Sequence, residues 1–435
     1  MFKNLIEGAK MPDLRKKILI TLGLLLVYRL GAFIPVPGIE PTYFNYAIEG
    51  TGASDFLMLL NSLAGGALAN GAILALGVGP YITSSIVMQL LTIAIPSLER
   101  LSKQGDEGRR KIAVYTRYVA LLMALAQAIA IVVSLGVGGQ LESNLLGGIP
   151  QAVVAIMVII TLVAGSLFTV WIGDKITEHG IGNGMSMLIF IGIISTGVGA
   201  FYVSVVEVFS DINAIVTPLV FITVLSLIFF AVVFVDLAER RIPVTYAKQV
   251  KGNKMYGGQS ANIPIKVNAV GVIPIIFAFS ILNFPQLIMS LFWPNSGAYA
   301  WFSQYLGAGS WANIVLTALL ILGFSYFYAS LSFNPDDVAR QIQQNGGFIL
   351  GYRPGIPTRD YLKKVHNRIT LFGALFLMVM ALAPALIFRG AMGTENPLTN
   401  AFTGIAILIT VSVALEFDKQ LQAQMLMKSY KGFLK

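Results

Sequence analysis

The side chains that could carry catalytic or metal chemistry are few in this chain of 435 residues. It contains two histidines, His179 and His366, and no cysteine, so disulfides and thiolate metal sites are excluded. The sequence has no H-E-x-x-H zinc motif, no G-x-x-x-x-G-K-[ST] phosphate loop and no G-x-S-x-G nucleophile motif. Both histidines are expected in loops, where a lone histidine is more often a surface residue than a ligand. We therefore predict that the protein is not an enzyme and has no catalytic residue, no metal site and no cofactor.

One glycine-rich stretch, Gly-Ile-Gly-Asn-Gly at 180–184, has a superficial likeness to a nucleotide-binding loop. It is expected to follow a helix rather than a strand, which argues against a phosphate site. Its glycines favour a tight turn into the next apolar stretch and a close approach between helices.

Acidic side chains are absent from the interior of the long apolar stretches. Those nearby, for example Asp174, Asp236 and Glu416, stand at the ends of a stretch. Proton- or ion-coupled carriers usually keep a titratable or ligating group at mid-membrane. The sequence therefore favours a cavity without coupling chemistry. A secondary solute transporter with inverted repeats is the first alternative, and an insertase or membrane enzyme without a continuous pore is the second.

Two pairs of apolar residues have the spacing of a helical face. Val78 and Ile82 are four residues apart, and so are Met185 and Ile189. A ring of such side chains can seal a pore by excluding water. The spacing alone, however, favours ordinary packing between helices.

The elements that would position these residues are membrane-spanning helices. The chain is 56% hydrophobic and 12% charged, with a mean hydropathy of +0.76, whereas soluble domains are about 25% charged. A helix needs about 20 apolar residues to cross the hydrocarbon core. Ten stretches meet that length, namely 17–36, 71–95, 114–135, 151–172, 181–206, 214–235, 269–292, 312–333, 369–388 and 397–415. The first has no small-residue cleavage site behind it, so we expect it to be retained rather than removed as a signal peptide.

The basic residues predict the orientation. All thirty Lys and Arg except Arg29 and Arg389 fall in alternate gaps between the apolar stretches, and the intervening gaps hold acidic residues or no charge. Because cationic loops stay on the cytoplasmic side, both termini are predicted to be cytoplasmic, which agrees with an even number of spans. The net charge of +9 favours contact with anionic lipid and acidic partners, including RNA.

Two kinds of segment do not fit simple spanning. Residues 55–70 are apolar, then small and glycine-rich, and are too short to cross. We expect a re-entrant piece that lines a cavity, with an amphipathic helix on the outer surface as the alternative. The cytoplasmic loops 236–267 and 334–368 are long, but their composition indicates ordered structure. The first predicts a hairpin, and the second predicts a short helix at 338–344 after an N-cap signal at Asn334. We expect both loops to be surfaces for a partner.

A short internal repeat indicates two halves. Gly77-Val78-x-Pro80-x-Ile82 opens the second stretch, and Gly271-Val272-x-Pro274-x-Ile276 opens the seventh. Five helices separate the two copies, so the halves would cross the membrane in opposite senses. We predict an N-terminal half at 1–206, a connection at 207–218 and a C-terminal half at 219–435. A chance match of four residues is the alternative.

Seven ordered blocks of this sequence resemble the signature blocks of the bacterial SecY family, the channel subunits of the Sec protein translocon. The blocks cover essentially the whole chain and are RLGAFIPVPG at 29–38, GVGPYIT at 77–83, EGRRK at 107–111, ITEHGIGNG at 176–184, RRIPVTYAK at 240–248, PIKVNAVGVIP at 264–274 and RPG at 353–355. The resemblance implies an all-α membrane protein of ten helices, in two inverted five-helix halves that form a clamshell around a short re-entrant plug.

The resemblance also implies the functional residues. The hydrophobic pore ring falls on Val78, Ile82, Met185, Ile189, Ile276 and Ile409. Two of these, Val78 and Met185, stand where isoleucine is common and are still apolar. The plug corresponds to Leu60, Asn61, Ser62, Leu63, Ala64, Gly65, Gly66 and Ala67. A lateral gate between the second, third, seventh and eighth helices is implied at Thr83, Gln127, Pro274 and Phe279.

Partners follow from the same resemblance. Loop residues that contact the motor ATPase SecA and the ribosome are implied at Arg240, Arg241, Lys248, Arg353, Pro354 and Gly355. The tip of the second loop departs from the usual pattern, because it lacks a proline before Arg353. The other implied partners are the small membrane subunits SecE and SecG, signal sequences, unfolded preproteins and anionic lipid. The implied activity is Sec-dependent export of preproteins across the bacterial cytoplasmic (inner) membrane and lateral insertion of membrane proteins into it.

Overall fold

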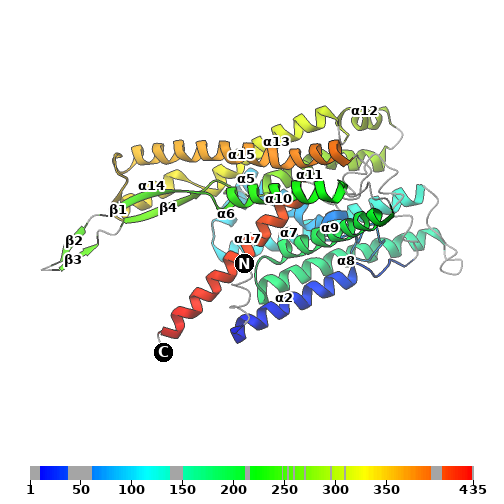
Figure 1. Cartoon of the computed structure of the whole chain (residues 1–435), viewed down its shortest axis with the longest axis horizontal. Helices are drawn as coiled ribbons and strands as arrows, with labels where there is room; N and C mark the ends of the chain where they lie inside the picture. The colour runs from blue at the N-terminus through cyan, green and yellow to red at the C-terminus, as the bar shows by residue number, and fades with distance from the viewer. Residues whose placement is uncertain are drawn as a thin grey trace.

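The computed structural model describes residues 10–37, 61–137, 150–210, 216–246, 248–251, 254–257, 260–268, 271–293, 296–307, 310–392 and 404–433. Long helices in this part of the chain run side by side along the long axis of the molecule (Figure 1). They are α2 (Pro12–Gly31), α5 (Gly79–Ala94), α7 (Asp106–Val137), α8 (Gln151–His179), α9 (Gly184–Ser210), α10 (Val216–Leu237), α11 (Ile273–Phe292), α13 (Trp311–Ser332), α15 (Ile356–Met392) and α17 (Gly404–Phe433). Each of the ten predicted stretches overlaps one of them, so the prediction of ten helices is confirmed.

Length and composition support membrane crossing for most of these helices. In the described part of the chain, six helices are long and apolar enough to cross a membrane. A seventh span results if α5 and α6 (Pro96–Ser102) are counted together. These two helices meet at a bend of 105°. Large apolar side chains stay exposed on the outward faces, including Phe230 at 73% and Phe234 at 77% of α10. Lipid rather than water suits such a surface.

Two predicted boundaries are wrong. Residues 71–78 do not form the first part of the second helix, because their backbone pairs with the segment that follows α2. Val36 N–H donates to Gly71 O at 2.8 Å, and Ile73 N–H donates to Ile34 O at 2.9 Å. The ninth predicted stretch, 369–388, is only the middle of α15. That helix begins at Ile356, with Pro357 in the first turn, where a missing N–H costs nothing.

The predicted internal repeat has a structural counterpart. Gly77 and Gly271 both have positive φ, at 51° and 65°. The following valines, Val78 and Val272, are the N-caps of α5 and α11 with nearly equal backbone angles, φ −88° and ψ −2° against φ −89° and ψ −4°. Each helix then has a proline in its first turn. The same local geometry therefore begins one helix in each half.

The two long loops fold together at one end of the helices, on the left in Figure 1, whereas α12 (Gly297–Leu306) lies at the other end. The predicted hairpin is confirmed: β1 (Glu239–Tyr246) pairs antiparallel with β4 (Ser260–Lys266), and β2 (Lys248–Lys251) pairs with β3 (Lys254–Gly257). The short strand β5 (Gly347–Phe348) adds to the free edge of β1. We refer to this end, with its strands and α14, as the strand-bearing end.

The predicted helix in the second loop is also confirmed. It is α14 (Pro335–Gln344), and the Asn334 side chain caps it by accepting a hydrogen bond from the Asp336 N–H at 3.1 Å. Ile342 of α14 packs in a small apolar core with Val244 of β1 and Leu362 of α15. The two loops therefore form one packed unit.

Candidate functional site

The six residues of the implied pore ring come together in one apolar cluster. They come from α5 or its N-cap, α9, α11 and α17. Val78, Ile189 and Ile409 are buried members of the central core, and Ile82, Met185 and Ile276 pack against it half-buried. The i, i+4 pairs predicted on α5 and α9 therefore belong to the same apolar core. We name the six residues Val78, Ile82, Met185, Ile189, Ile276 and Ile409 the neck.

The neck contains only hydrocarbon and one thioether. Tyr28 belongs to the same hydrophobic core, and its hydroxyl donates to the backbone carbonyl of Ala64 at 3.4 Å. A dry, flexible lining of this kind excludes ions without offering specific polar contacts. Among the described residues, no three His, Asp or Glu side chains lie close enough to hold a metal ion.

The segment 61–70, which we name the plug segment, lies inside the protein next to the neck; Leu60 of the predicted plug is outside the described residues. Only 61–63 are helical, and turns follow. Ala64 and Ala67 are at most 1% exposed and pack with Ala32 and Ala72. This burial favours the re-entrant prediction over a helix on the outer surface.

Small residues let the plug segment approach its neighbours. Gly65 has a φ of 71°, and a Cβ built on it would lie 2.9 Å from Gly192 Cα of α9. A Cβ on Gly192 would in turn lie 2.6 Å from the Leu63 carbonyl oxygen. A side chain at either position would collide with backbone, so glycine is required for this contact.

Side chains from two helices bind the plug backbone. Arg29 Nη1 of α2 donates to Gly65 O at 2.5 Å, and its guanidinium lies 4.9 Å from the Phe33 ring centroid. The Tyr28 hydroxyl donates to Ala64 O at 3.4 Å, and the Thr196 hydroxyl of α9 donates to Ser62 O at 3.4 Å. These contacts were not predicted from the sequence. Its one signal was that Arg29 is a basic residue within an apolar stretch.

A cleft lies between helices of the two halves, toward the strand-bearing end. Its volume is about 410 Å³, and it is lined by Gln89, Thr92 and Ile93 of α5, Ile112 of α7, Ile273 of α11, and Tyr328, Leu331 and Ser332 of α13. These four helices are the ones in which the resemblance implies a lateral gate. We name this space the gate cleft.

The four implied gate residues do not line the gate cleft. Thr83 donates to Gly79 O of its own helix at 3.1 Å. Gln127 is 5% exposed, and its Oε1 accepts no hydrogen bond from the described residues. Pro274 is buried in the first turn of α11, and Phe279 packs against the central core.

Four of the implied partner-binding residues are on the surface of the strand-bearing end. Arg240 and Arg241 are exposed on β1, and Lys248 lies on β2. Arg353 and Pro354 are exposed at a tight tip. The Thr358 hydroxyl braces that tip by donating to Arg353 O at 2.7 Å, and the Tyr352 and Tyr361 rings stack at 4.2 Å. These contacts hold the tip although the usual proline is missing.

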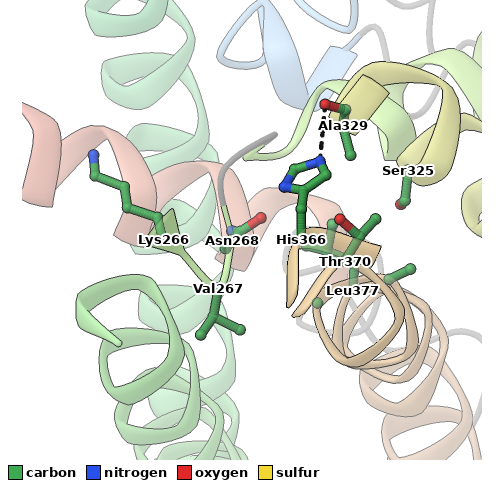
Figure 2. A pocket seen from close by; sticks show the side chains of 10 residues that line it. Lys266, Val267, Asn268, Ser325, Ala329, His366, Thr370 and Leu377 are labelled. Atoms are coloured by element: carbon green, nitrogen blue, oxygen red, sulfur yellow. Dashed lines mark hydrogen bonds between the residues drawn. The ribbon is translucent and has the colours of Figure 1, made fainter. Parts of the chain in front are cut away.

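A polar network joins the base of these loops to the helices, next to a small cavity that Asn268 and His366 line (Figure 2). Asp236 of α10 accepts hydrogen bonds from Asn268 Nδ2 at 2.6 Å and from the Ser412 hydroxyl of α17 at 2.8 Å. The prediction that His366 is a surface loop residue is wrong. It lies on α15, is 5% exposed and contacts Ala329 O of α13 through Nε2 at 3.1 Å, beside a cavity of about 10 Å³.

Comparisons with known proteins agree with this geometry. The family model described as SecY matches residues 72–417. The chain is 42% identical over 448 residues to the protein translocase subunit SecY of Mycobacterium tuberculosis, with 100% of both chains covered. It is 40% identical over 446 residues to that of Streptomyces coelicolor, again with 100% of both covered.

Solved structures show the same fold. A protein-conducting channel matches with a TM-score of 0.63 and 21% identity over 96% of both chains. Sec61 in the canine ribosome–channel complex matches with a TM-score of 0.59 and 20% identity, also over 96% of both. The fold is therefore a clamshell of ten helices in two inverted halves.

The tight contact at Gly192 predicts how the plug segment can be released. In Gly192→Leu, the new side chain collides with Leu63 O, and such overpacking typically costs about 1–3 kcal/mol. We expect a single cysteine introduced by Ser62→Cys into this cysteine-free chain to react with a water-soluble maleimide at least about fivefold faster. Gly199→Leu on the same helix is the control, because nothing lies within 4 Å of its Cβ. Equal labelling of the cysteine at position 62 in the two variants would show that the contact at Gly192 does not hold the plug segment in place.

Proposed function

Because this chain belongs to the SecY family of protein translocase subunits, we propose that the neck is the seal of a protein-conducting channel. Unfolded preproteins pass through it across the membrane, and membrane segments leave sideways through the gate cleft. The observation that carries the proposal is that six apolar side chains, from four helices of both halves, belong to one packed core. The family also favours a channel over the solute transporter.

The chemistry of the neck suits an unfolded chain. A polypeptide of arbitrary sequence has no fixed pattern of polar groups, so specific polar contacts could not recognise it. Branched aliphatic side chains and Met185 can move apart and close around chains of different width. Without a chain, the same side chains exclude water and limit the leak of ions.

The plug segment supports a closed resting state. It lies against the neck and is held mainly through its own backbone carbonyls by Tyr28, Arg29 and Thr196. Such contacts can be broken as one unit when the segment moves. The halves 1–206 and 219–435, joined at 207–218, would part around it like a hinge.

The gate cleft suits an apolar signal helix. It opens between α5 and α7 of one half and α11 and α13 of the other, and most of its lining is apolar. A signal helix gains about 25 cal/mol per Å² of apolar surface that it moves from water into lipid or into such a cleft. Partition, rather than sequence-specific contact, would select it.

The strand-bearing end is the surface for partners that supply force. Arg240, Arg241 and Arg353 are exposed there, and they complement acidic protein surfaces or ribosomal RNA. We assign this end to SecA and the ribosome, and the outward apolar helix faces to SecE, SecG and lipid. By the positive-inside rule this end is cytoplasmic, in the bacterial inner membrane, with both termini on that side. The energy for movement then comes from SecA or the ribosome.

The channel proposal predicts contact between the neck and a passing chain. Single cysteines introduced by Ile82→Cys and Ile276→Cys should crosslink to a secretory chain stalled in the membrane complex. Ile281→Cys, whose parent side chain is 43% exposed on α11, should not. A stalled chain that avoids both neck positions would reject the channel and favour an insertase without a continuous pore.

The seal predicts the effect of a polar neck. Ile276→Asn places an amide among apolar side chains, so water enters the neck more easily. We expect a higher ion conductance of the resting complex in planar bilayers and export of preproteins with defective signals. Ile281→Asn on the outward face of the same helix is the control. If conductance and signal selectivity both matched the parent, the neck would not be the seal.

The partner surface predicts a separate phenotype. Arg353→Glu reverses the charge of an exposed loop tip without touching the apolar core, so the complex should assemble normally. We expect at least a tenfold loss of SecA-driven export, because a like charge now opposes the acidic partner. Lys16→Glu, at an exposed position of α2 outside the strand-bearing end, is the matched control. Normal export by the Arg353 variant would refute this assignment.

A further inference from the structure

A hydrogen bond crosses the gate cleft and joins the two halves. The Tyr328 hydroxyl of α13 donates to Gln89 Oε1 of α5 at 2.8 Å, and the two residues are 239 positions apart in the sequence. Both line the gate cleft. Neither residue was among the gate positions that the sequence implied.

The Tyr328 ring is held in place by other aromatic rings. Phe277 of α11 meets it edge-on at 5.0 Å and 65°, and Phe327 meets it edge-on at 5.7 Å and 86°. Ile86 of α5 belongs to the same buried cluster. The ring is 8% exposed, so its hydroxyl has a fixed direction toward the cleft.

Gln89 differs from Tyr328 in its burial, because Gln89 is exposed in the cleft. Its amide can therefore turn to water when the helices separate, whereas the Tyr328 hydroxyl stays on a ring anchored among apolar groups. Opening between α5 and α13 must break this bond. A purely apolar helix in the opening offers no acceptor in return, and an unpaired hydroxyl in such surroundings is unfavourable.

We propose that the Tyr328–Gln89 pair is a latch that sets how apolar a signal helix must be to open the channel sideways. The latch adds a constant free-energy cost to opening. The free energy that a signal helix gains by burying apolar surface must exceed that cost. Strong signals exceed it easily, and weak signals do not. This inference rests on the proposed channel function and assigns two specificity-determining residues within it.

The test measures signal selectivity in membranes that contain the complete complex. Two secretory reporters differ only in the apolar core of the signal, one full-length and one shortened. Tyr328→Phe keeps the ring and removes the donor. It should raise export of the shortened-signal reporter about two- to tenfold, the equivalent of one hydrogen bond, and leave the full-length reporter unchanged. Tyr326→Phe is the matched control, since Tyr326 is on the same helix and 40% exposed.

Variants of the acceptor separate a latch from a general packing role. Gln89→Leu should reproduce Tyr328→Phe, and the double variant should show no further gain, because both changes remove one interaction. Gln89→Glu keeps an acceptor opposite Tyr328 and should restore the parent ratio or lower it. Additive effects of the two single variants, or equal changes for both reporters, would overturn the latch.

The outcome also distinguishes the latch from the channel. If the parent complex exports the full-length reporter and the Tyr328 and Tyr326 variants behave alike, the latch is refuted and the channel stands. If the parent complex exports neither reporter, the proposed function itself is refuted.

Discussion

Backbone contact at glycines is the constraint on which the neck depends. Gly165 of α8 lies against the Ile73 carbonyl, and Gly184 of α9 lies against the Gly173 carbonyl, each so closely that no Cβ could be added. Gly192 makes a similar contact with the plug segment. Side chains as short as Val78 can meet across a centre only if the helices that carry them approach this closely. The packing around the neck therefore depends on small residues in the neighbouring helices as much as on its own apolar residues.

Side-chain hydrogen bonds join the plug segment to α2, the two halves across the gate cleft, and the loops of the strand-bearing end to the helices. Arg29 binds the plug segment, Tyr328 binds α5 across the gate cleft, and Asp236 ties the base of the loops to α17. Groups of this kind are costly to leave unpaired away from water. They therefore hold one arrangement until a competing interaction replaces them. The neck has no such bonds, and it can change its width without leaving a polar group unsatisfied.

The strand-bearing end and the gate are mechanically continuous. β1, α14 and α15 share an apolar core, so force applied to the exposed loop tip reaches α15 directly. His366 on α15 contacts the Ala329 carbonyl of α13, and α13 carries Tyr328 (Figure 2). A partner bound to the loops thus acts on a helix that borders the gate cleft. Rigid elements and packed side chains are the physical means by which such coupling travels.

The sequence by itself determined the class, the ten helices and the apolar character of the neck. Apolar length fixes which segments can cross a membrane, and helical spacing fixes which side chains of one helix share a face, as with Val78 and Ile82. The tertiary structure alone decided which faces meet. It brought Tyr328 to Gln89 and Arg29 to Gly65, and it buried His366, which was expected at the surface because it was placed in a loop. Such contacts join residues far apart in the chain, and the periodicity within one helix contains no information about which other helix will pack against it.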